Sequence, residues 1–302
     1  SISGDPNLLR HGSEAQERQA LQADAVEQLD VFVWPHAHSA GEILRAARAG
    51  HYDVVTSQDP FWRGFLAWRI ARKTGPRLNL QVHADLDGQS FAKRLLARFL
   101  LPRADTVRVV SERIKGQVEA LGARGRITVL PIFIDVSRVM GASRAQHPRF
   151  KKVILWYGRF EKEKNPFRAL SVLREVRAQG VDVGLIMLGS GSCENRLHVA
   201  AKDLPVEFPG WVEPKEYLAM ADVVLSTSRS ESYGASVVEA LAAGVPVVSL
   251  DVGIAREAGA RIAEEGSLAG ALAEVLGSGE KGSLKLQLLS REDWARAWRE
   301  SL

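Results

Sequence analysis

The sequence of 302 residues lacks three features that define other classes of protein: paired cysteines, a long hydrophobic run and a signal peptide. Cys193 is the single cysteine, which excludes an internal disulfide and indicates a reducing compartment. The longest apolar stretches, such as Leu95–Leu101 and residues 240–250, are shorter than the roughly 20 residues that span a bilayer. From Ser1 onward there is neither the basic start nor the apolar middle of a signal peptide. These absences predict a cytoplasmic protein.

The composition is that of an ordinary globular protein. Hydrophobic residues make up 46% of the chain and charged residues 25%, with 26 Gly and 12 Pro, which excludes disordered and collagen-like chains. At roughly 150 residues per domain, the length predicts two domains. Ile2 is the only residue that could represent an opening strand, so we expect a few residues to precede Ser1 in the natural protein.

The charge is distributed unevenly along the chain. Residues 1–149 hold 21 Lys and Arg against 15 Asp and Glu, whereas residues 150–302 hold 19 against 21. The net charge of +4 is therefore the sum of +6 and −2. Two interpretations stay open for the basic half: a peripheral contact with the inner face of a membrane, or solvated helix faces. We expect no nucleic-acid partner.

Short apolar or β-branched runs recur, each followed by a turn and a segment with helical periodicity. Continuous apolar strands that alternate with amphipathic helices are typical of parallel sheets covered on both faces. The pattern pauses at residues 137–150, so it predicts two doubly wound α/β domains, at 1–147 and 148–302. The runs are residues 31–34, 53–56, 78–82, 106–110 and 127–130, then 153–157, 183–188, 206–208, 222–226 and 245–249.

Ligands of doubly wound sheets bind beyond the carboxyl ends of the strands, so the loops there are the candidate sites. The run 153–157 leads into a loop that carries Arg159 and Lys164 and ends at Asn165-Pro166, which predicts a helix start. Cations beside a helix start favour a phosphate. The alternative is a solvated charge run, neutralised locally by Glu161 and Glu163.

A second loop, Gly189-Ser190-Gly191, follows the next strand. Gly-x-Gly after a strand suggests dinucleotide binding, but Glu194 stands where the third glycine is required. The nicotinamide-dependent interpretation therefore fails. A tight turn that lets a ligand approach the backbone and a plain strand-to-helix turn both remain.

The third candidate segment contains Glu231 and Glu239. Glu239 lies among apolar residues of a predicted helix, where an uncompensated buried carboxylate would be costly, so we expect it to face a cleft. The intervening Tyr233, Gly234, Ala235 and Ser236 offer backbone N–H groups at a helix start. This arrangement suits a ligand with hydroxyls at both ends and a diphosphate between them. The alternative is a capping glutamate and a buried glutamate paired with Arg or Lys.

The two glutamates, with seven residues between them, resemble the E-x7-E motif of the retaining GT-B glycosyltransferases of family 4. Gly158-Arg159 with Lys164 resembles that family's diphosphate-binding stretch. Further similar segments are Phe208–Val212 near the donor base, the loop Gly12-Ser13-Glu14, the strand-end His83, residues 105–111 and residues 130–135. Ser13 and Tyr233 replace the family's commoner Gly and Phe, and the abrupt region 87–89 suggests a reduced acceptor loop.

The resemblance implies a GT-B fold with an N-terminal acceptor domain, a C-terminal donor domain and a last helix that packs back toward the first. It implies metal-independent, retaining transfer from a UDP- or GDP-linked sugar to a glycan, lipid-linked or small-molecule acceptor. A catalytically silent module that binds sugar nucleotides is the alternative. The implied catalytic residues are His83, Arg159, Lys164 and Glu231. The implied donor-binding residues are Gly12, Ser13, Gly158, Gly189, Gly191, Trp211, Val212, Tyr233, Gly234, Ala235, Ser236 and Glu239.

Three weaker signals complete the sequence. Asp85-Leu86-Asp87 matches a metal-diphosphate pattern, but two residues supply few ligands for a hard cation. His36 and His38 lack nearby Cys or acidic partners for zinc. The segment 91–100 predicts an apolar, basic helix, which we expect to pack on the core with its cations extended to solvent, with a membrane contact as the alternative.

Overall fold

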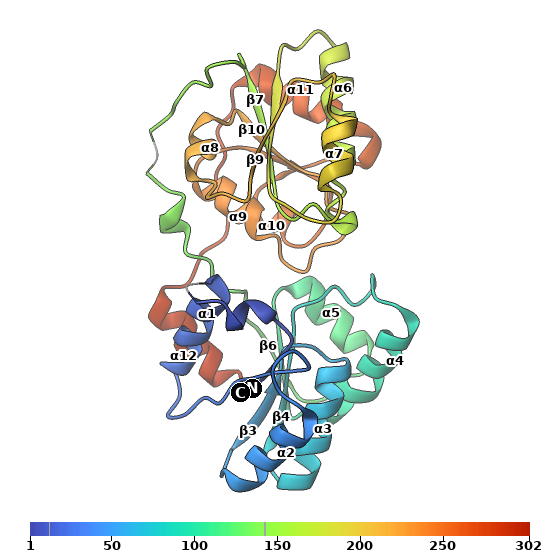
Figure 1. Cartoon of the computed structure of the whole chain (residues 1–302), viewed down its shortest axis with the longest axis vertical. Coiled ribbons are helices and arrows are strands. Elements are labelled where there is room, and N and C mark those ends of the chain that lie inside the picture. The colour runs from blue at the N-terminus through green and yellow to red at the C-terminus, as the bar shows by residue number, and fades with distance from the viewer. Residues whose placement is uncertain (12, 142) are drawn as a thin grey trace. The chain divides into compact units, whose positions relative to one another are not determined.

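The computed structural model describes residues 1–11, 13–141 and 143–302, so Gly12 lies outside the described residues. It divides into two compact units (Figure 1). The first comprises residues 1–133 and 288–302, and the second residues 134–287. Each unit contains one six-stranded sheet in which all neighbouring strands are parallel. The predicted α/β class with two doubly wound sheets is confirmed.

The sheet of the first unit has the strand order β2-β1-β3-β4-β5-β6. Every predicted run before residue 137 overlaps one of its strands, and the short opening strand at Ile2 is present. The strands are β1 Ile2–Ser3, β2 Phe32–Val33, β3 Val54–Ser57, β4 Arg77–Val82, β5 Thr106–Val109 and β6 Arg126–Val129. The α-helices are α1 Glu14–Ala23, α2 Ala40–Ala49, α3 Trp62–Thr74, α4 Phe91–Leu100, α5 Glu112–Ala120 and α12 Arg291–Glu300.

The sheet of the second unit has the order β12-β11-β10-β7-β8-β9, so its strand order reverses between β7 and β10. Its strands are β7 Val153–Tyr157, β8 Gly184–Leu188, β9 Val206–Gly210, β10 Val223–Ser226, β11 Val247–Ser249 and β12 Arg261–Ile262. Its α-helices are α6 Pro166–Ala178, α7 Glu194–Ala200, α8 Lys215–Met220, α9 Ala235–Ala242, α10 Ala255–Ala258 and α11 Leu268–Ser278. Single-turn 3₁₀ helices are η1 Pro6–Leu9, η2 Leu101–Arg103, η3 Val136–Arg138, η4 Lys162–Lys164 and η5 Glu265–Ser267.

The second unit has the apolar core that its sequence predicts. Strands β7, β8 and β10 are buried along most of their length, and α6 and α11 pack on them with Leu170, Leu173 and Leu272. Runs that are apolar at every position suit strands covered on both faces. The core therefore holds the carboxyl ends of β7 and β10 in a fixed frame.

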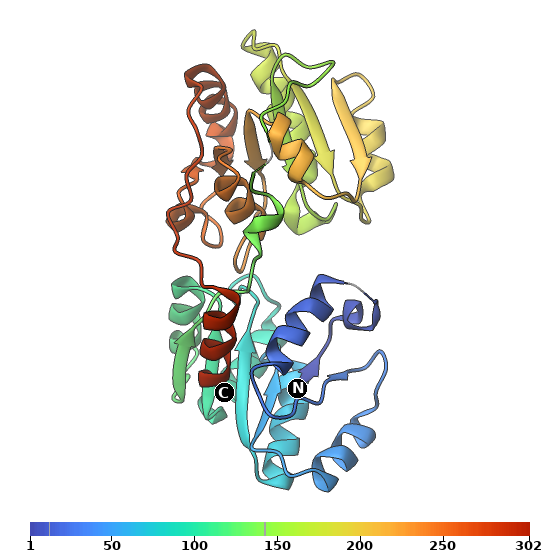
Figure 2. The ribbon, with the colours of Figure 1, turned by 90° about the vertical axis from the view of Figure 1, so that its left-hand side faces the viewer.

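The first sheet has a polar interior beside α12. Asn79, Thr106 and Arg108 are buried on β4 and β5. The Asn79 side-chain amide donates to the Ser301 carbonyl at 2.9 Å, and Trp294 Nε1 donates to the Pro131 carbonyl at 2.8 Å. Figure 2 shows α12 in dark red alongside this sheet. Buried polar groups need hydrogen-bond partners, and the segment around α12 supplies them to the first sheet. These hydrogen bonds hold the last helix to the first unit.

Three details differ from the sequence expectations. Residues 134–147, expected in the first domain, belong to the second unit, where the Ala145 N–H donates to the Ala219 carbonyl at 3.0 Å. Asn165 precedes α6 as expected, but it adopts a left-handed conformation (φ 51°) and its side chain makes no cap hydrogen bond. Helix α4 packs on the core with Ala97 and Leu100 as expected, but it also leaves two large apolar residues in water, since Phe91 is 82% exposed and Leu95 58%.

Candidate functional site

The candidate site lies in the second unit, beyond the carboxyl ends of β7 and β10. The strand order reverses between these neighbours, which is where doubly wound sheets bind their ligands. The loop after β7 carries Arg159 and Lys164, and the loop after β10 carries Glu231. The structure therefore brings together residues that lie about seventy positions apart in the sequence, as parallel strands require.

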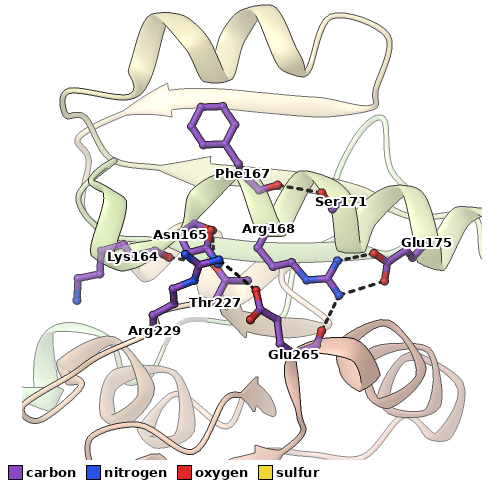
Figure 3. Close-up of polar contacts among 9 residues, drawn as sticks. All are labelled: Lys164, Asn165, Phe167, Arg168, Ser171, Glu175, Thr227, Arg229 and Glu265. Atoms are coloured by element: carbon purple, nitrogen blue, oxygen red, sulfur yellow. Dashed lines mark hydrogen bonds and ion pairs between the residues drawn. The ribbon is translucent and has the colours of Figure 1, made fainter. Parts of the chain in front are cut away.

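The two loops are joined by Thr227, a fully buried residue that follows β10 directly. Its hydroxyl lies 3.1 Å from the Lys164 carbonyl and 3.0 Å from the Asn165 carbonyl, and accepts from Trp156 Nε1 at 2.9 Å. Figure 3 shows Thr227 beside the turn at Lys164 and Asn165. Because Trp156 lies on β7, this chain of hydrogen bonds fixes the Lys164 turn to both central strands.

A second group of contacts supports the same turn (Figure 3). The Arg229 backbone N–H donates to the Glu163 carbonyl at 3.0 Å, and its guanidinium lies 3.4 Å from the carboxylate of Glu265. Arg168 pairs with Glu175 through both carboxylate oxygens and donates to the Glu265 carbonyl at 2.6 Å. Residues from α6, η5 and the loop after β10 therefore hold one another in place.

The two predicted phosphate ligands have different partners. The Lys164 ammonium pairs with the Glu231 carboxylate, and both side chains are mostly buried. Arg159 pairs with Glu163 at 2.9 Å, with both side chains exposed, so that pair contributes little to stability. Glu161, a local neutraliser in the alternative interpretation, accepts hydrogen bonds from the Ser192 N–H at 2.9 Å and hydroxyl at 2.6 Å. These hydrogen bonds lower the pKa of Glu161.

The glycines at the strand ends permit a close approach of two backbones. A Cβ built at Gly189 would lie 1.9 Å from the Gly158 carbonyl oxygen, and Gly189 has φ 148°. The Gly158 N–H donates to the Leu188 carbonyl at 3.0 Å. The tight turn at Gly189 and Gly191 is thus required by the neighbouring strand end, whatever ligand approaches it.

Helix α9 starts at Ala235 after Gly234, which has φ 107° and provides no side-chain cap. Glu239 is half-buried and lies beside the Tyr157 hydroxyl, which donates to the Ser236 carbonyl at 2.6 Å. Burial, and then the Glu239 carboxylate, raise the pKa of Tyr157 well above its ordinary value. Tyr157 therefore stays a neutral hydroxyl beside Glu239.

Three other predicted residues of this unit have distinct surroundings. Tyr233 is buried and burial raises its pKa to about 12. Its carbonyl accepts from the Ile254 N–H at 2.9 Å, so it anchors the loop that carries Glu231. Trp211 is 68% exposed just after β9, with Val212 beside it. Trp211 offers an indole face to a planar ligand.

His83 belongs to the first unit, where it follows β4. Arg108 lies 3.2 Å from its Nε2 and also donates to Gln81 at 2.8 Å and to the Pro131 carbonyl at 2.9 Å. Burial, the Arg108 charge and the Arg18 charge lower the pKa of His83 to about 3, so the imidazole is neutral at pH 7. Because Arg108 donates, Nε2 accepts and the ring proton is on Nδ1.

The remaining candidates of the first unit have structural partners. The Ser13 hydroxyl donates to the Asn7 carbonyl at 2.6 Å and accepts from the Gln16 N–H at the start of α1. Gly12 lies outside the described residues. The amide of Gln117 donates to both Asp85 and Asp87 at 2.8 Å. His38 Nδ1 accepts from the Val33 N–H at 3.0 Å.

Thr227, Tyr157 and Arg108 were not predicted from the sequence. Thr227 and Tyr157 each stand at a strand end, in the region already identified as a candidate site, and this position was the available signal. Arg108 interrupts an otherwise apolar run, and a cation in such a strand signals a buried hydrogen-bond network.

Each half of the chain matches the model of a known glycosyltransferase family. The model of the glycosyl transferases group 1 family matches residues 142–284, and that of glycosyltransferase family 4 matches residues 18–138. The chain belongs to the glycosyl transferases group 1 family. Family 4 enzymes are retaining. The resemblance drawn from the two glutamates is thereby confirmed.

Curated relatives of the family match parts of the chain. A GDP-mannose-dependent alpha-(1-6)-phosphatidylinositol dimannoside mannosyltransferase of Mycobacterium tuberculosis is 29% identical over 200 residues, which are 60% of this chain and 52% of the relative. An alpha-monoglucosyldiacylglycerol synthase of Streptococcus pneumoniae is 32% identical over 235 residues, 68% of this chain and 53% of the relative. The chain thus spans about half the length of the curated relatives it matches.

Solved structures of the family share the fold. Anabaena Alr3699/HepE in complex with UDP superposes with a TM-score of 0.73 at 17% identity, covering 98% of this chain and 93% of that chain. The lipopolysaccharide outer core galactosyltransferase WaaB superposes with a TM-score of 0.68 at 15% identity, covering 99% and 94%. At these identities the likeness shows the fold, which is GT-B.

No helix within residues 1–11, 13–141 and 143–302 is long and apolar enough to span a membrane.

Proposed function

We propose that this protein transfers a sugar from a nucleotide-sugar donor, with retention of the anomeric configuration, and that the second unit binds the donor. The observation that carries the proposal is the Lys164–Glu231 pair at the point where the strand order reverses. An ammonium has three N–H donors, so Lys164 is able to bind Glu231 and a phosphate together. The relatives named for GDP-mannose and solved with UDP support a donor of this class.

The donor diphosphate binds Arg159, Lys164 and the backbone at Gly234 and Ala235, where α9 begins. Negative charge develops on the diphosphate as the glycosidic bond breaks, and cations held in advance stabilise it. Thr227 keeps the Lys164 turn in position for this role. We propose that this positive charge makes a divalent metal unnecessary.

The two glutamates have separate roles in the proposal. Glu239 accepts hydrogen bonds from the ribose hydroxyls, with Trp211 and Val212 near the base. Glu231 lies near the reacting sugar, where its carboxylate favours the positive charge that develops on the ring. For His83, the predicted catalytic residue of the first unit, the Nδ1–H is the group available to a sugar hydroxyl, since Arg108 occupies Nε2. Lipid acceptors in the names of two relatives support a lipid-linked acceptor.

The first test is calorimetric titration with UDP-, GDP- and ADP-sugars and with the free nucleoside diphosphates. Lys164→Ala and Arg159→Ala are each expected to weaken diphosphate binding by about 1.5–3 kcal/mol, the range for charge-assisted hydrogen bonds. Lys162→Ala is the matched control, because Lys162 is an exposed cation of the same turn. Unchanged affinity in both site variants would refute the assignment.

The second test separates the glutamates by steady-state kinetics on variants whose melting temperatures are unchanged. Glu239→Gln is expected mainly to raise the donor KM, because ribose contacts are equal in the ground and transition states. Glu231→Gln is expected mainly to lower kcat. Donor binding without turnover across an acceptor panel would instead identify a silent sugar-nucleotide-binding module.

A further inference from the structure

Helix α4 presents its apolar face to solvent. Phe91, Leu95 and Phe99 are four residues apart, so they share one face, and they are 82%, 58% and 36% exposed. The buried positions are Ala97 and Leu100, on the opposite side. A surface helix ordinarily turns its large apolar residues to the core. Here Ala97 and Leu100 face the core, whereas Phe91 and Leu95 extend into water.

The apolar face of α4 continues onto α3. Phe99 packs edge-on against Trp68 of α3, with ring centroids 5.2 Å apart. The Lys93 ammonium lies 5.3 Å from the Phe61 ring centroid, which places the first turn of α4 beside the start of α3. Trp62, the first residue of α3, is 59% exposed. Phe99 and Trp68 therefore join the two helices, and Trp62 is a further exposed aromatic residue of α3 in the first unit.

The same surface is positively charged. Arg94 and Arg98 are exposed on α4, and neither α3 nor α4 contains Asp or Glu. The Arg103 guanidinium, just after α4, stacks 3.9 Å from the Phe99 ring centroid. We define the α3/α4 surface as the exposed residues Trp62, Phe91, Leu95, Arg94, Arg98 and Phe99.

We propose that the α3/α4 surface docks the first unit onto a bilayer that contains anionic lipids. Guanidinium groups bind lipid phosphates, and the negative surface of such a bilayer complements a surface without carboxylates on either helix. Apolar and aromatic side chains beside those cations enter the boundary between headgroups and acyl chains. The proposal does not rest on the transfer reaction, because it concerns the location of the first unit.

The apolar side chains distinguish a bilayer from other anionic partners. A nucleic acid or an acidic protein segment would use the arginines, but neither requires Phe91 and Leu95 to leave water. A bilayer requires both, since interfacial binding adds apolar burial to electrostatic attraction. The prediction is therefore that two kinds of substitution each reduce binding to the same vesicles.

The experiment is sedimentation of the full chain with vesicles of phosphatidylcholine alone and of phosphatidylcholine mixed with phosphatidylglycerol. The wild type is expected to bind the mixed vesicles and to bind the neutral ones far more weakly. Arg94→Gln/Arg98→Gln is expected to weaken binding about thirtyfold, the effect of two cations at an anionic surface. Phe91→Ser/Leu95→Ser is expected to weaken it about tenfold or more.

Two matched controls accompany these variants. Arg291→Gln/Arg299→Gln removes two exposed cations from α12 of the same unit, a helix that also carries acidic residues. Val199→Ser removes an apolar side chain that is 78% exposed on α7 of the second unit. Both controls are expected to bind like the wild type. Far-UV circular dichroism and melting temperatures check that every variant is folded.

Tryptophan fluorescence provides a second measurement. The indole of Trp62 is expected to shift to shorter wavelength on mixed vesicles, and the shift is expected to disappear in Trp62→Phe. Equal binding to both kinds of vesicle, binding to neither, or unchanged binding by either double variant would overturn the proposal. So would a concentration-dependent dimer that the Phe91→Ser/Leu95→Ser variant abolishes, since a second copy would then cover the surface.

Discussion

The depressed pKa of His83 predicts that the first unit loses stability as the pH falls below neutrality. The folded imidazole has a pKa of about 3, because of burial and the charges of Arg108 and Arg18, whereas an unfolded imidazole titrates near 6.5. Between these values the unfolded chain binds more protons than the folded one. The contribution is therefore complete above pH 6.5 and is lost progressively as the pH falls toward 3.

The magnitude follows from the two pKa values. Each pH unit within this window changes the free energy of unfolding by about 1.4 kcal/mol per proton. From pH 7 to pH 5 the unfolded imidazole goes from about a quarter protonated to almost fully protonated, while the folded imidazole takes up almost no proton. The expected loss from His83 alone is about 2 kcal/mol.

The assay is amide hydrogen exchange of β4 at pH 7 and pH 5, corrected for the intrinsic exchange rates. Exchange in this strand reports the opening of the first unit separately from the second. His83→Gln keeps an acceptor for Arg108 but does not titrate. Between pH 7 and pH 5, the free energy of unfolding of this variant is therefore expected to fall by about 2 kcal/mol less than that of the wild type. His51→Gln, at an exposed position of the same unit, is the matched control. Identical pH dependence in wild type and His83→Gln would refute the argument.

Three further predictions concern the stability of the second unit and the need for a metal. Thr227→Val leaves Trp156 Nε1 without its acceptor, so urea unfolding is expected to show a loss of about 1–3 kcal/mol that Thr227→Ser largely restores; full stability in Thr227→Val would contradict the role of the hydroxyl. Gly189→Ala places a methyl group 1.9 Å from the Gly158 carbonyl, so the melting temperature is expected to fall sharply, whereas Gly270→Ala, on open space in α11, is the control expected to melt like the wild type. Turnover is expected to persist in excess EDTA, and loss of activity that Mg²⁺ or Mn²⁺ restores would show that a metal is required.

The sequence predicted the central strands of the second sheet well because they are continuous apolar runs. The run at residues 153–157 coincides with β7, and the run at 183–188 contains β8, since both faces of these strands are covered. The two glutamates identified the family for a different reason, because their spacing places Glu231 on the loop before α9 and Glu239 inside that helix. Periodicity and motif spacing are local properties, so both can be recognised in the sequence alone.

The contacts that position the residues of the candidate site could not be predicted from the sequence. Of the two glutamates that the alternative interpretation named as neutralisers, Glu163 does pair with Arg159, whereas the Glu161 carboxylate accepts from Ser192 after the adjacent strand. Lys164 pairs with Glu231 across two loops, and Thr227 binds the carbonyls of the Lys164 turn. These partners are neighbours only because β7 lies between β8 and β10. The exposure of Phe91 and Leu95 on α4 was not predicted either, because helical periodicity does not determine which side of a helix packs on the sheet.

The division of the first unit into two separated parts of the chain has a consequence for its synthesis. Residues 1–133 leave the ribosome first, then the whole second unit, and only then residues 288–302. Until α12 arrives, Asn79 lacks the Ser301 carbonyl and Trp294 does not cover the Arg108 guanidinium. The second unit is continuous and is able to close first. Within this chain, the sheet of residues 1–133 is therefore completed only after the whole second unit has been synthesised, and Asn79 lacks its α12-side partner until then.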